Sequence, residues 1–541
     1  MRTDIVKMYK DVHTWVGIIS GLALFIAFYA GAITMFETQL ERWASPPADI
    51  SAPPALEDVD SLIAKVHEAY PETRDNFQVQ FYPAPDRPAM VTWQPPRPRS
   101  REMFSNTDFY AASLDANGEL EVVTLERSQM AQLIDVLHQQ VGLPFEHEVA
   151  MPIMGTIALM YAVALVSGVI ILVPSLIKDL FILRRGKNLK RMWLDAHNVL
   201  GIFSLPFHII MAITAVIFAF HDQIYDTQYE VVYGPERVPE LWEVGEVPYP
   251  KHADDAQRLT PSEVVARMSE QAPGFTPMVL NYRKSRAGDK TLLVEGMDTR
   301  YIVRGPVTGM VYIDPVTGDL LRTDYMPGMQ DGWHQTVISF FALHFGTYGG
   351  MSVRWAYFFL GLAGAFLFYS GNLLWIESRR KKSRRGKDAV QRKDVRILGA
   401  LTVGVSLGSI AGISVTIAAA KWLPVMGLAT GPVHMAVYYA VFLACVAWAF
   451  LRGAALAGKE LMYVCALATF LIPFTSAVAL LWPTGPVWNH GSLETLMVDL
   501  TALLVALCFI TIARRAAKRI EAGPTDSIWS AGDVPTPTPA E

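Results

Sequence analysis

The chain has little charge and almost no cysteine. Charged residues make up 18% of its 541 residues, below the roughly 25% of an ordinary soluble domain, whereas 52% are hydrophobic. Its three cysteines, Cys445, Cys465 and Cys508, lie in apolar runs, so we expect small buried hydrophobes rather than disulfides or zinc ligands. The net charge of −5 gives no support for a nucleic-acid partner. Together with apolar windows of about 20 residues, this composition argues against a purely soluble enzyme.

Eight apolar segments are long enough to cross a hydrocarbon layer of about 30 Å at about 1.5 Å per residue. They run roughly over 13–36, 151–173, 197–220, 350–375, 397–420, 433–451, 460–482 and 494–513. The first lacks a convincing cleavage site, so we expect a retained helix rather than a signal peptide. The sequence therefore predicts an α-helical integral membrane protein with about eight transmembrane helices.

Lysine and arginine predict the orientation of these helices, because basic loops stay in the cytoplasm. In an eight-span arrangement, four basic clusters fall on one side: the N-terminus, the loops after the second and fourth spans, and the tail. They comprise Arg2, Lys7, Lys10, Lys178, Arg184, Arg185, Lys187, Lys190, Arg191, Arg379, Arg380, Lys381, Lys382, Arg384, Arg385, Lys387, Arg514, Arg515, Lys518 and Arg519. We expect both termini in the cytoplasm of a bacterium, with the helices in its inner (plasma) membrane.

Two long stretches, 37–150 and 221–345, then face the periplasm and share one pattern. The second has a helix-capping signal at Thr260, strand-like runs at 290–295 and 300–304, and a hairpin turn at Asp314–Asp319. The first has a helix at about 57–69, strands near 77–82 and 88–93, and a turn at Asp115–Gly118. We expect two small α+β modules, each with one helix against a small antiparallel sheet. The expected segments are 1–36, 37–150, 151–220, 221–345, 346–376, 377–396, 397–513 and 514–541.

Most of the 12 histidines cluster at the ends of expected spans, where an ionisable side chain suggests function. His13 and His197 open the first and third spans at matching depth near the cytoplasm. Two neutral imidazoles on adjacent helices can ligate the two faces of a haem iron. Gly17 and Gly201, one turn deeper, would leave room for the macrocycle. Asp195 is a candidate second-shell acceptor. The alternative is interfacial histidines that reach lipid headgroups.

A second haem would need ligands nearer the outward side. His208 follows His197 by 11 residues, so on one continuous helix the two would share a face. His344 is the preferred outer ligand because Gly346, Gly349 and Gly350 lie beside it. His208 and His138 are its preferred partners, and further alternatives are His147, His221 and His334. His334 and His221 could instead contact substrate or metal, His434 and His490 receive no redox role, and His67 and His252 are interpreted as surface residues.

This arrangement resembles the PepSY-associated transmembrane proteins, which include inner-membrane ferric-siderophore reductases. The resemblance covers about residues 1–380. Its motifs are His13-Thr-Trp-Val-Gly17, Leu137-His138, Asp195-Ala-His197-Asn-Val-Leu-Gly201, Leu343-His344-Phe-Gly346, Leu374-Trp375 and the Asp314–Asp319 turn. It implies one or two b-type haems in a four-helix core, with His13, His197, His344 and His138 as ligand positions. The polar segment 137–150 is longer than the usual link, so His147 stays an alternative to His138.

The resemblance also implies electron transfer to periplasmic ferric siderophores. The chelate would bind outward, near Trp333, Tyr348 and Trp355. No glycine-rich dinucleotide motif follows a predicted strand, so we expect a membrane quinol, or an unidentified protein, as the electron donor. Two other hypotheses are a non-enzymatic PepSY protein that binds or regulates a periplasmic partner, and an iron or siderophore transporter. Transport is the weakest, since Asp499 is the only clear carboxylate in the spans.

Overall fold

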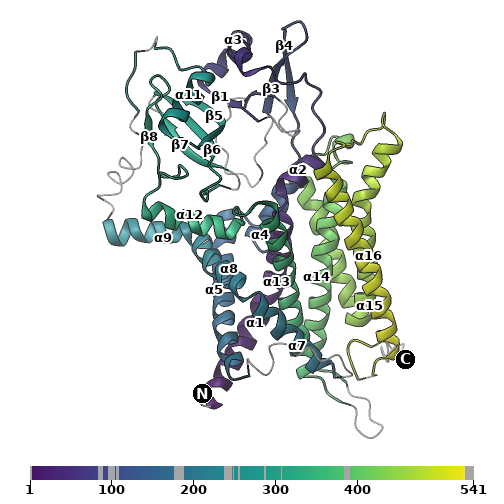
Figure 1. Cartoon of the computed structure of the whole chain (residues 1–541). Coiled ribbons are helices and arrows are strands. Elements are labelled where there is room, and N and C mark those ends of the chain that lie inside the picture. The colour runs from purple at the N-terminus through teal and green to yellow at the C-terminus, as the bar shows by residue number, and fades with distance from the viewer. Residues whose placement is uncertain are drawn as a thin grey trace. The chain divides into compact units, whose positions relative to one another are not determined.

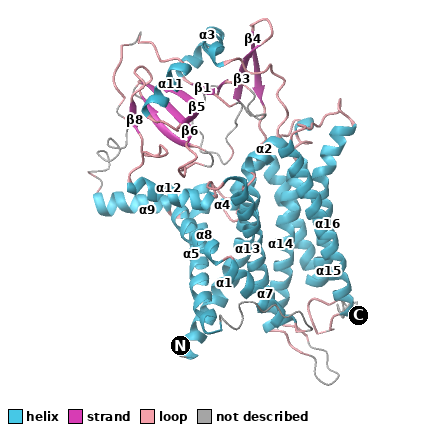
Figure 2. Ribbon diagram, in the orientation of Figure 1, coloured by secondary structure: helices cyan, strands magenta, loops and turns pink. Residues whose placement is uncertain are grey.

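The computed structural model describes residues 3–82, 89–94, 104, 109–175, 188–234, 236, 247, 249–253, 256–284, 288–305, 308–382, 390–524 and 526–530. The chain forms two compact units. The first, made of 1–44, 128–220 and 355–541, is helical; the second, made of 45–127 and 221–354, contains a β-sheet (Figures 1 and 2).

Six helices among the described residues are long and apolar enough to cross a membrane. They are α1 (Thr3–Thr34), α5 (His147–Leu172), α13 (Gly350–Ser378), α14 (Lys393–Ala419), α15 (Gly431–Leu481) and α16 (Leu493–Ala522). Shorter helices of this unit are α2 (Glu37–Ala44), α4 (Met130–Gln139), η3 (Val173–Ser175) and η5 (Pro424–Met426). Part of the expected cytoplasmic charge lies outside the described residues: Arg2, Lys178, Arg184, Arg185, Lys187, Arg384, Arg385 and Lys387. The orientation therefore stays a prediction.

The third expected span, 197–220, is a broken helix. α7 (Leu189–Phe203) and α8 (Leu205–Ala219) meet at an angle of 72°. Pro206 in the first turn of α8 has no N–H to donate, and in a continuous helix its ring would clash with the preceding turn. The prediction of one continuous helix here is wrong. The shared helix face inferred for His197 and His208 is wrong for the same reason.

α15 contains the sixth and seventh expected spans in one element of 51 residues. At about 1.5 Å per residue such a helix would be about 76 Å long, more than twice the hydrocarbon thickness. Gly453 interrupts it with a non-helical backbone, φ 74° and ψ 159°, which glycine adopts without a Cβ penalty. By length and composition, the structure has six spanning helices, or seven if α7 and α8 count together. Eight spans stay a prediction that depends on α15 crossing twice.

Close packing between α14 and α15 relies on glycines four residues apart. A Cβ at Gly404, Gly408 or Gly412 would lie 2.9–3.0 Å from α15 atoms. Small residues at this spacing let membrane helices approach closely, since lipid gives no hydrophobic drive for association. Cys445 and Cys465 are buried in this part of the helical unit as expected, whereas Cys508 on α16 is exposed. The prediction for Cys508 is therefore wrong, because it lies on a face of α16 that no other helix covers.

The second unit contains one antiparallel sheet rather than the two separate sheets expected. Its strands are β1 (Phe77–Gln80), β2 (Val91–Trp93), β3 (Phe109–Leu114), β4 (Leu120–Leu125), β5 (Thr276–Lys284), β6 (Lys290–Met297), β7 (Gly309–Ile313) and β8 (Leu320–Arg322). They lie in the order β4-β3-β2-β1-β5-β6-β7-β8. β1 pairs with β5, with Val79 opposite Leu280, so pairing between the two stretches completes the sheet. The strand expected at 300–304 is absent, and β7 follows it instead.

Each half of the sheet carries one helix: α3 (Val59–Ala69) in the first half and α11 (Pro261–Gln271) in the second. The two hairpin turns match as well, because Gly118 and Gly318 both have a positive φ, 77° and 80°. In each half a helix side chain donates to that glycine's carbonyl: Lys65 Nζ at 2.5 Å and Gln271 Nε2 at 2.8 Å. These equivalent contacts show that the two halves are repeats of one α+β unit.

Smaller elements complete the second unit. They are η1 (Leu56–Asp58), η2 (Pro71–Asp75), α9 (His221–Thr227), the π-helix η4 (Gln228–Tyr233) and α12 (Gly332–Phe345). The expected capping box of α11 is present at Thr260 and Glu263.

Two histidines that were expected at the surface have structural partners in this unit. His67 Nδ1 lies 2.8 Å from Thr73 Oγ1, and burial, helped by the charge of Arg258, lowers the pKa of His67 to about 4. His252 Nε2 lies 2.8 Å from an oxygen of Asp314, whose residue is only 1% exposed. Both side chains are therefore half-buried with tertiary partners, which sequence polarity does not reveal.

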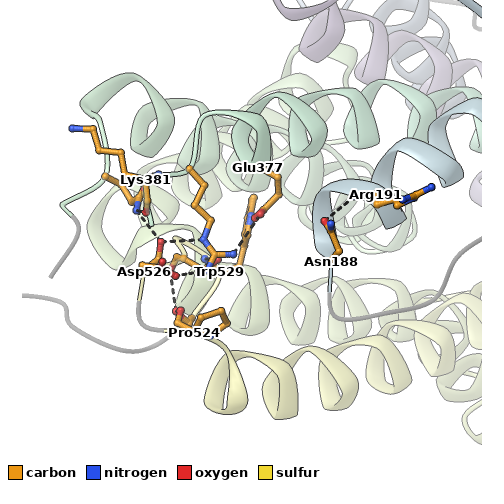
Figure 3. Close-up of polar contacts among 11 residues, drawn as sticks. Asn188, Arg191, Glu377, Lys381, Pro524, Asp526 and Trp529 are labelled. Carbon is orange, nitrogen blue, oxygen red and sulfur yellow. Dashed lines mark hydrogen bonds and ion pairs between the residues drawn. The ribbon is translucent and has the colours of Figure 1, made fainter. Parts of the chain in front are cut away.

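The chain after α16 packs back onto the ends of α13 and α14 (Figure 3). Arg380 forms an ion pair with Asp526, and Gln391 Nε2 donates to the Asp526 carbonyl at 2.8 Å. Ile528 lies over Gly399, where a Cβ would come within 2.5 Å of it. Trp529 packs in the same apolar cluster as Ile18 and Trp375. The start of the expected tail is thus an integral part of the helical unit.

The Asp314–His252 pair generates a prediction about pH and stability. Burial alone would raise the pKa of Asp314, but hydrogen bonds from Val316, His252 and Thr317 hold it below its usual value. Its contribution to stability is therefore present above pH of about 3.9 and is lost as pH falls through the lowered pKa. Asp314→Asn should destabilise the second unit by about 1–2 kcal/mol at pH 7, and by less in acid.

Thermal unfolding of the purified chain between pH 7 and pH 2 measures this difference. Asp115→Asn is the matched control, because Asp115 occupies the same turn position in the first half but is not paired with a histidine. An equal loss of stability in both variants at every pH would contradict the assigned role of His252.

Candidate functional site

The imidazoles of His13 and His197 face one another inside the helical unit. His13 lies on α1 and His197 on α7, and their ring centroids are 6.2 Å apart with an angle of 77° between the planes. The structure therefore brings together the two residues that the sequence pairs. Asp195 is buried, with 3% of its surface exposed.

Hydrogen bonds fix the tautomer of both rings. His13 Nδ1 lies 2.8 Å from the Ala164 carbonyl on α5, so it carries a proton and donates. His197 Nδ1 lies 3.1 Å from Ser370 Oγ on α13. That hydroxyl donates its own proton to the Leu367 carbonyl, so it accepts from His197. In both neutral rings the lone pair therefore sits on Nε2, which is the state required of a metal ligand.

Two glycines that the sequence reasoning missed allow this arrangement. A Cβ at Gly168 would lie 3.0 Å from His13 Cε1, and one at Gly371 would lie 3.5 Å from His197 Cε1. Gly17 and Gly201, the expected small residues, contact neither ring; a Cβ at Gly17 has no neighbour within 4 Å. The signal was the Ser-Gly pair, which occurs at 167–168 on α5 and again at 370–371 on α13.

The pair fits an iron bound between its rings. Two imidazoles on opposite faces of one metal, at metal–nitrogen distances of about 2.0 Å, place their ring centroids about 6 Å apart. The observed 6.2 Å agrees with this separation. Because both Nδ1 atoms are engaged and both Nε2 atoms carry lone pairs, the donor set suits a haem.

His208 forms a second site of the same chemical type. It is fully buried on α8, and Tyr161 Oη lies 2.6 Å from its Nδ1. The same hydroxyl donates to the His208 carbonyl at 3.1 Å, so it accepts from Nδ1. Nε2 of His208 is buried without a hydrogen-bond partner, which costs about 1–3 kcal/mol unless a ligand or water satisfies it. Phe28 of α1 and Gly364 of α13 border the ring.

His138 approaches α1 at the level of Ala27. Its Nδ1 lies 2.8 Å from the Ala27 carbonyl, and a Cβ at Gly31 would lie 2.6 Å from that nitrogen. Burial raises the pKa of Asp135, one turn earlier on α4. His147, the alternative to His138, is exposed at the first residue of α5. Within the helical unit, the structure thus places His138, and not His147, against α1.

The histidine sites occur at two levels along α1. His13 contacts His197 at one level, and Ala27 and Phe28 contact His138 and His208 at the other. The separation of about 14 residues corresponds to about 21 Å along the helix. α1, rather than the broken α7–α8 segment, therefore carries the two-level arrangement.

The remaining candidates have other surroundings. His344 belongs to the second unit, and the glycines after it adopt positive φ values that end α12 and begin α13. His221 is exposed beside Asp222, and His334 Nδ1 lies 2.8 Å from Asp331. All ligand roles stay predictions. No cluster of three or more His, Cys, Asp or Glu suited to a metal occurs among the described residues.

His434 is a feature that the sequence reasoning undervalued. It is fully buried on α15, its Nδ1 lies 2.8 Å from the Thr430 carbonyl, and its Nε2 has no hydrogen-bond partner. No signal in the sequence separates it from an ordinary helix-start histidine.

Comparison with known proteins gives one family. The family model described as the PepSY-associated TM region matches residues 11–378, which is more than half of the chain and contains both histidine levels. No curated protein matches the chain.

Proposed function

Because the chain belongs to the family of PepSY-associated transmembrane proteins, we propose that it is a haem-b-dependent reductase of the bacterial inner membrane. In this proposal one or two haems lie within the helical unit, and electrons pass to ferric siderophores in the periplasm. Reduction weakens the hold of hard oxygen ligands on iron and releases Fe(II). The coarser statement, a multi-pass membrane protein of this family, is established by the family match and the spanning helices.

The observation that carries the proposal is the His13–His197 pair. Both residues lie inside the matched region, their centroids are 6.2 Å apart, and their tautomers leave Nε2 as the ligand atom. The separation by itself also occurs in ordinary aromatic packing, so the proposal depends on the two Nε2 lone pairs and on the position of both residues in the matched region. When bound, a b-type haem supplies a one-electron Fe(III)/Fe(II) couple between these rings.

The protein's own residues prepare both levels. Ala164 and Ser370 orient the first pair through Nδ1, as second-shell partners commonly do. Tyr161 orients His208, and Phe28, Phe207 and Phe368 surround this level with aromatic rings. These rings exclude water and lower the local dielectric, and both effects influence the potential of a buried iron. His138 is the preferred second ligand at this level, with His344 retained from the family resemblance.

A membrane quinol is the proposed electron donor. Neither long stretch outside the spans shows a nucleotide-binding pattern: the second unit is an antiparallel sheet, whereas dinucleotide-binding folds use a parallel one. A lipid-soluble donor reaches a helical protein from the bilayer and needs no such domain.

The first test concerns the two inner ligands. Protein purified from haem-replete cells should show a Soret band that shifts on reduction with dithionite. His13→Ala and His197→Ala should each lower the haem content, because one axial ligand is lost. His67→Ala is the control, since His67 bonds to Thr73 in the second unit. A colourless wild-type protein would contradict the reductase proposal. Unchanged spectra in both variants would contradict the assignment of His13 and His197 as haem ligands.

A second prediction separates a ligand from a merely buried histidine. His208 and His434 both have a buried Nε2 without a partner, but only His208 lies within the matched region. His208→Ala should reduce the number of haems per chain from two to one. His434→Ala should leave that number unchanged. The pyridine haemochrome assay gives the ratio, and the opposite pattern would move the second site to α15.

A third prediction concerns electron transfer to the substrate. Protein reduced with a stoichiometric amount of dithionite should be reoxidised by a ferric siderophore, followed at the Soret band without oxygen. The Ga(III) form of the same siderophore should cause no change, because Ga(III) does not accept the electron. Equal traces with the two metals would contradict reduction of the chelate.

A further inference from the structure

Arg304 in the second unit has an unusual setting between β6 and β7. Its guanidinium carbon lies 4.7 Å from the ring centroid of Tyr325 and 4.7 Å from that of Phe341, a residue of α12. Cation–π contact with two rings holds a guanidinium in place without neutralising its charge. The head group of Arg304 is therefore positioned in advance, and it is only half-buried.

Arg304 also lacks an acidic partner, in contrast with its neighbours. Arg300 pairs with Asp298 at 2.6 Å, and Arg322 pairs with Asp324 at 2.6 Å. Among the residues that the structure describes, none forms an ion pair or hydrogen bond with Arg304, and its buried Nε is unsatisfied. A guanidinium presents its N–H donors in a planar fork, which matches the geometry of an oxygen anion.

Exposed aromatic groups lie close to Arg304 in the chain and on the facing helix. Tyr301 is 47% exposed, and it packs against Gly328, where a Cβ would lie 2.8 Å from the ring. Trp333 is 71% exposed at the start of α12, and Met329 is 46% exposed. A monomeric soluble surface rarely gathers such groups without a reason.

The charged groups near this surface are mostly paired. His334, on the same turn of α12 as Trp333, meets Tyr325 edge-on at 5.6 Å and bonds to Asp331. Asp324 is engaged by Arg322. The charge without a counter-charge is that of Arg304, so the ligand that would complete this surface is an anion with aromatic or apolar parts.

We propose that Arg304, held against Tyr325 and Phe341, anchors an anionic aromatic metal chelate of the tris-catecholate class, with the exposed Tyr301 and Trp333 of the same unit as further aromatic contacts. This inference rests on the proposed function and specifies its substrate class. The guanidinium would donate to catecholate oxygens, and the catechol rings would lie on the exposed aromatic side chains. The site discriminates against cationic chelates because Arg304 repels them.

The test measures binding without electron transfer. The full-length protein is titrated with a Ga(III) tris-catecholate complex, and its affinity is measured by calorimetry. Arg304→Met keeps the apolar stem but loses the charge, and should weaken affinity at least tenfold. Arg304→Lys keeps the charge without the planar donors and should give an intermediate value. Arg267→Met is the control and should bind like the wild type, because Arg267 is an exposed arginine of the same unit that pairs with Glu270 on α11.

Several outcomes would overturn the inference. They are unchanged affinity in Arg304→Met with unaltered thermal unfolding, an equal loss in Arg267→Met, or equally tight binding of citrate or inorganic phosphate. Arg304→Lys guards against misfolding, since it preserves the cation between the rings. Failure of the proposed function is distinguishable: Arg304-dependent binding of the Ga(III) complex would persist, while the ferric complex would not reoxidise the reduced protein.

Discussion

The bond from a histidine Nδ1 to an oxygen on another helix is the interaction on which the helical unit depends. It occurs between His13 and Ala164, between His197 and Ser370, and between His138 and Ala27, and Tyr161 makes the equivalent bond to His208. These bonds link α1 to α5, α7 to α13, α4 to α1, and α5 to α8. Each one also sets the tautomer, so the contacts that assemble the bundle are those that would prepare ligand atoms for the proposed haem. In the proposed function, helix packing and ligand preparation therefore use the same contacts.

The composition and the hydrophobic pattern predicted much of the fold, because length and apolarity are local properties. The spans α5, α13 and α14 begin within a few residues of expectation. The helix predictions were wrong where a single residue changes the backbone. Pro206 bends the third expected span, and Gly453 interrupts α15. The sequence also could not predict that the two α+β modules share one sheet. The pairing of β1 with β5 joins residues about 200 positions apart, and the residue pattern of neither strand indicates which strand it pairs with.

The site was predictable to a similar degree. The pairing of His13 with His197 followed from matching depth at two helix ends, and the structure brings them together. The glycines predicted to leave room for the macrocycle, Gly17 and Gly201, lie on the same helices as the histidines and contact neither imidazole ring. Side chains in a bundle meet residues of neighbouring helices, so the relevant glycines are Gly168 on α5 and Gly371 on α13. The setting of Arg304 could not be predicted from the sequence, because whether an arginine has an acidic partner depends on residues that only the fold brings near it.

The four C-terminal crossings expected from the sequence are best understood as a support for the histidine-bearing helices. At one end Trp43 of α2 is fully buried; its Nε1 donates to Asp499 of α16, and its ring lies 3.9 Å from Lys421 Nζ. Lys421 in turn donates to the Trp488 carbonyl, so its buried ammonium group has a partner. At the other end Trp529 packs in one cluster with Ile18 and Trp375. Ile18 lies five residues after His13, and Trp375 lies four residues after Gly371. The C-terminal part therefore contacts α2 at one end and packs with Ile18 of α1 at the other, within two helical turns of the His13–His197 pair. In the proposed function, this external restraint would help to keep the spacing between two rings on separate helices.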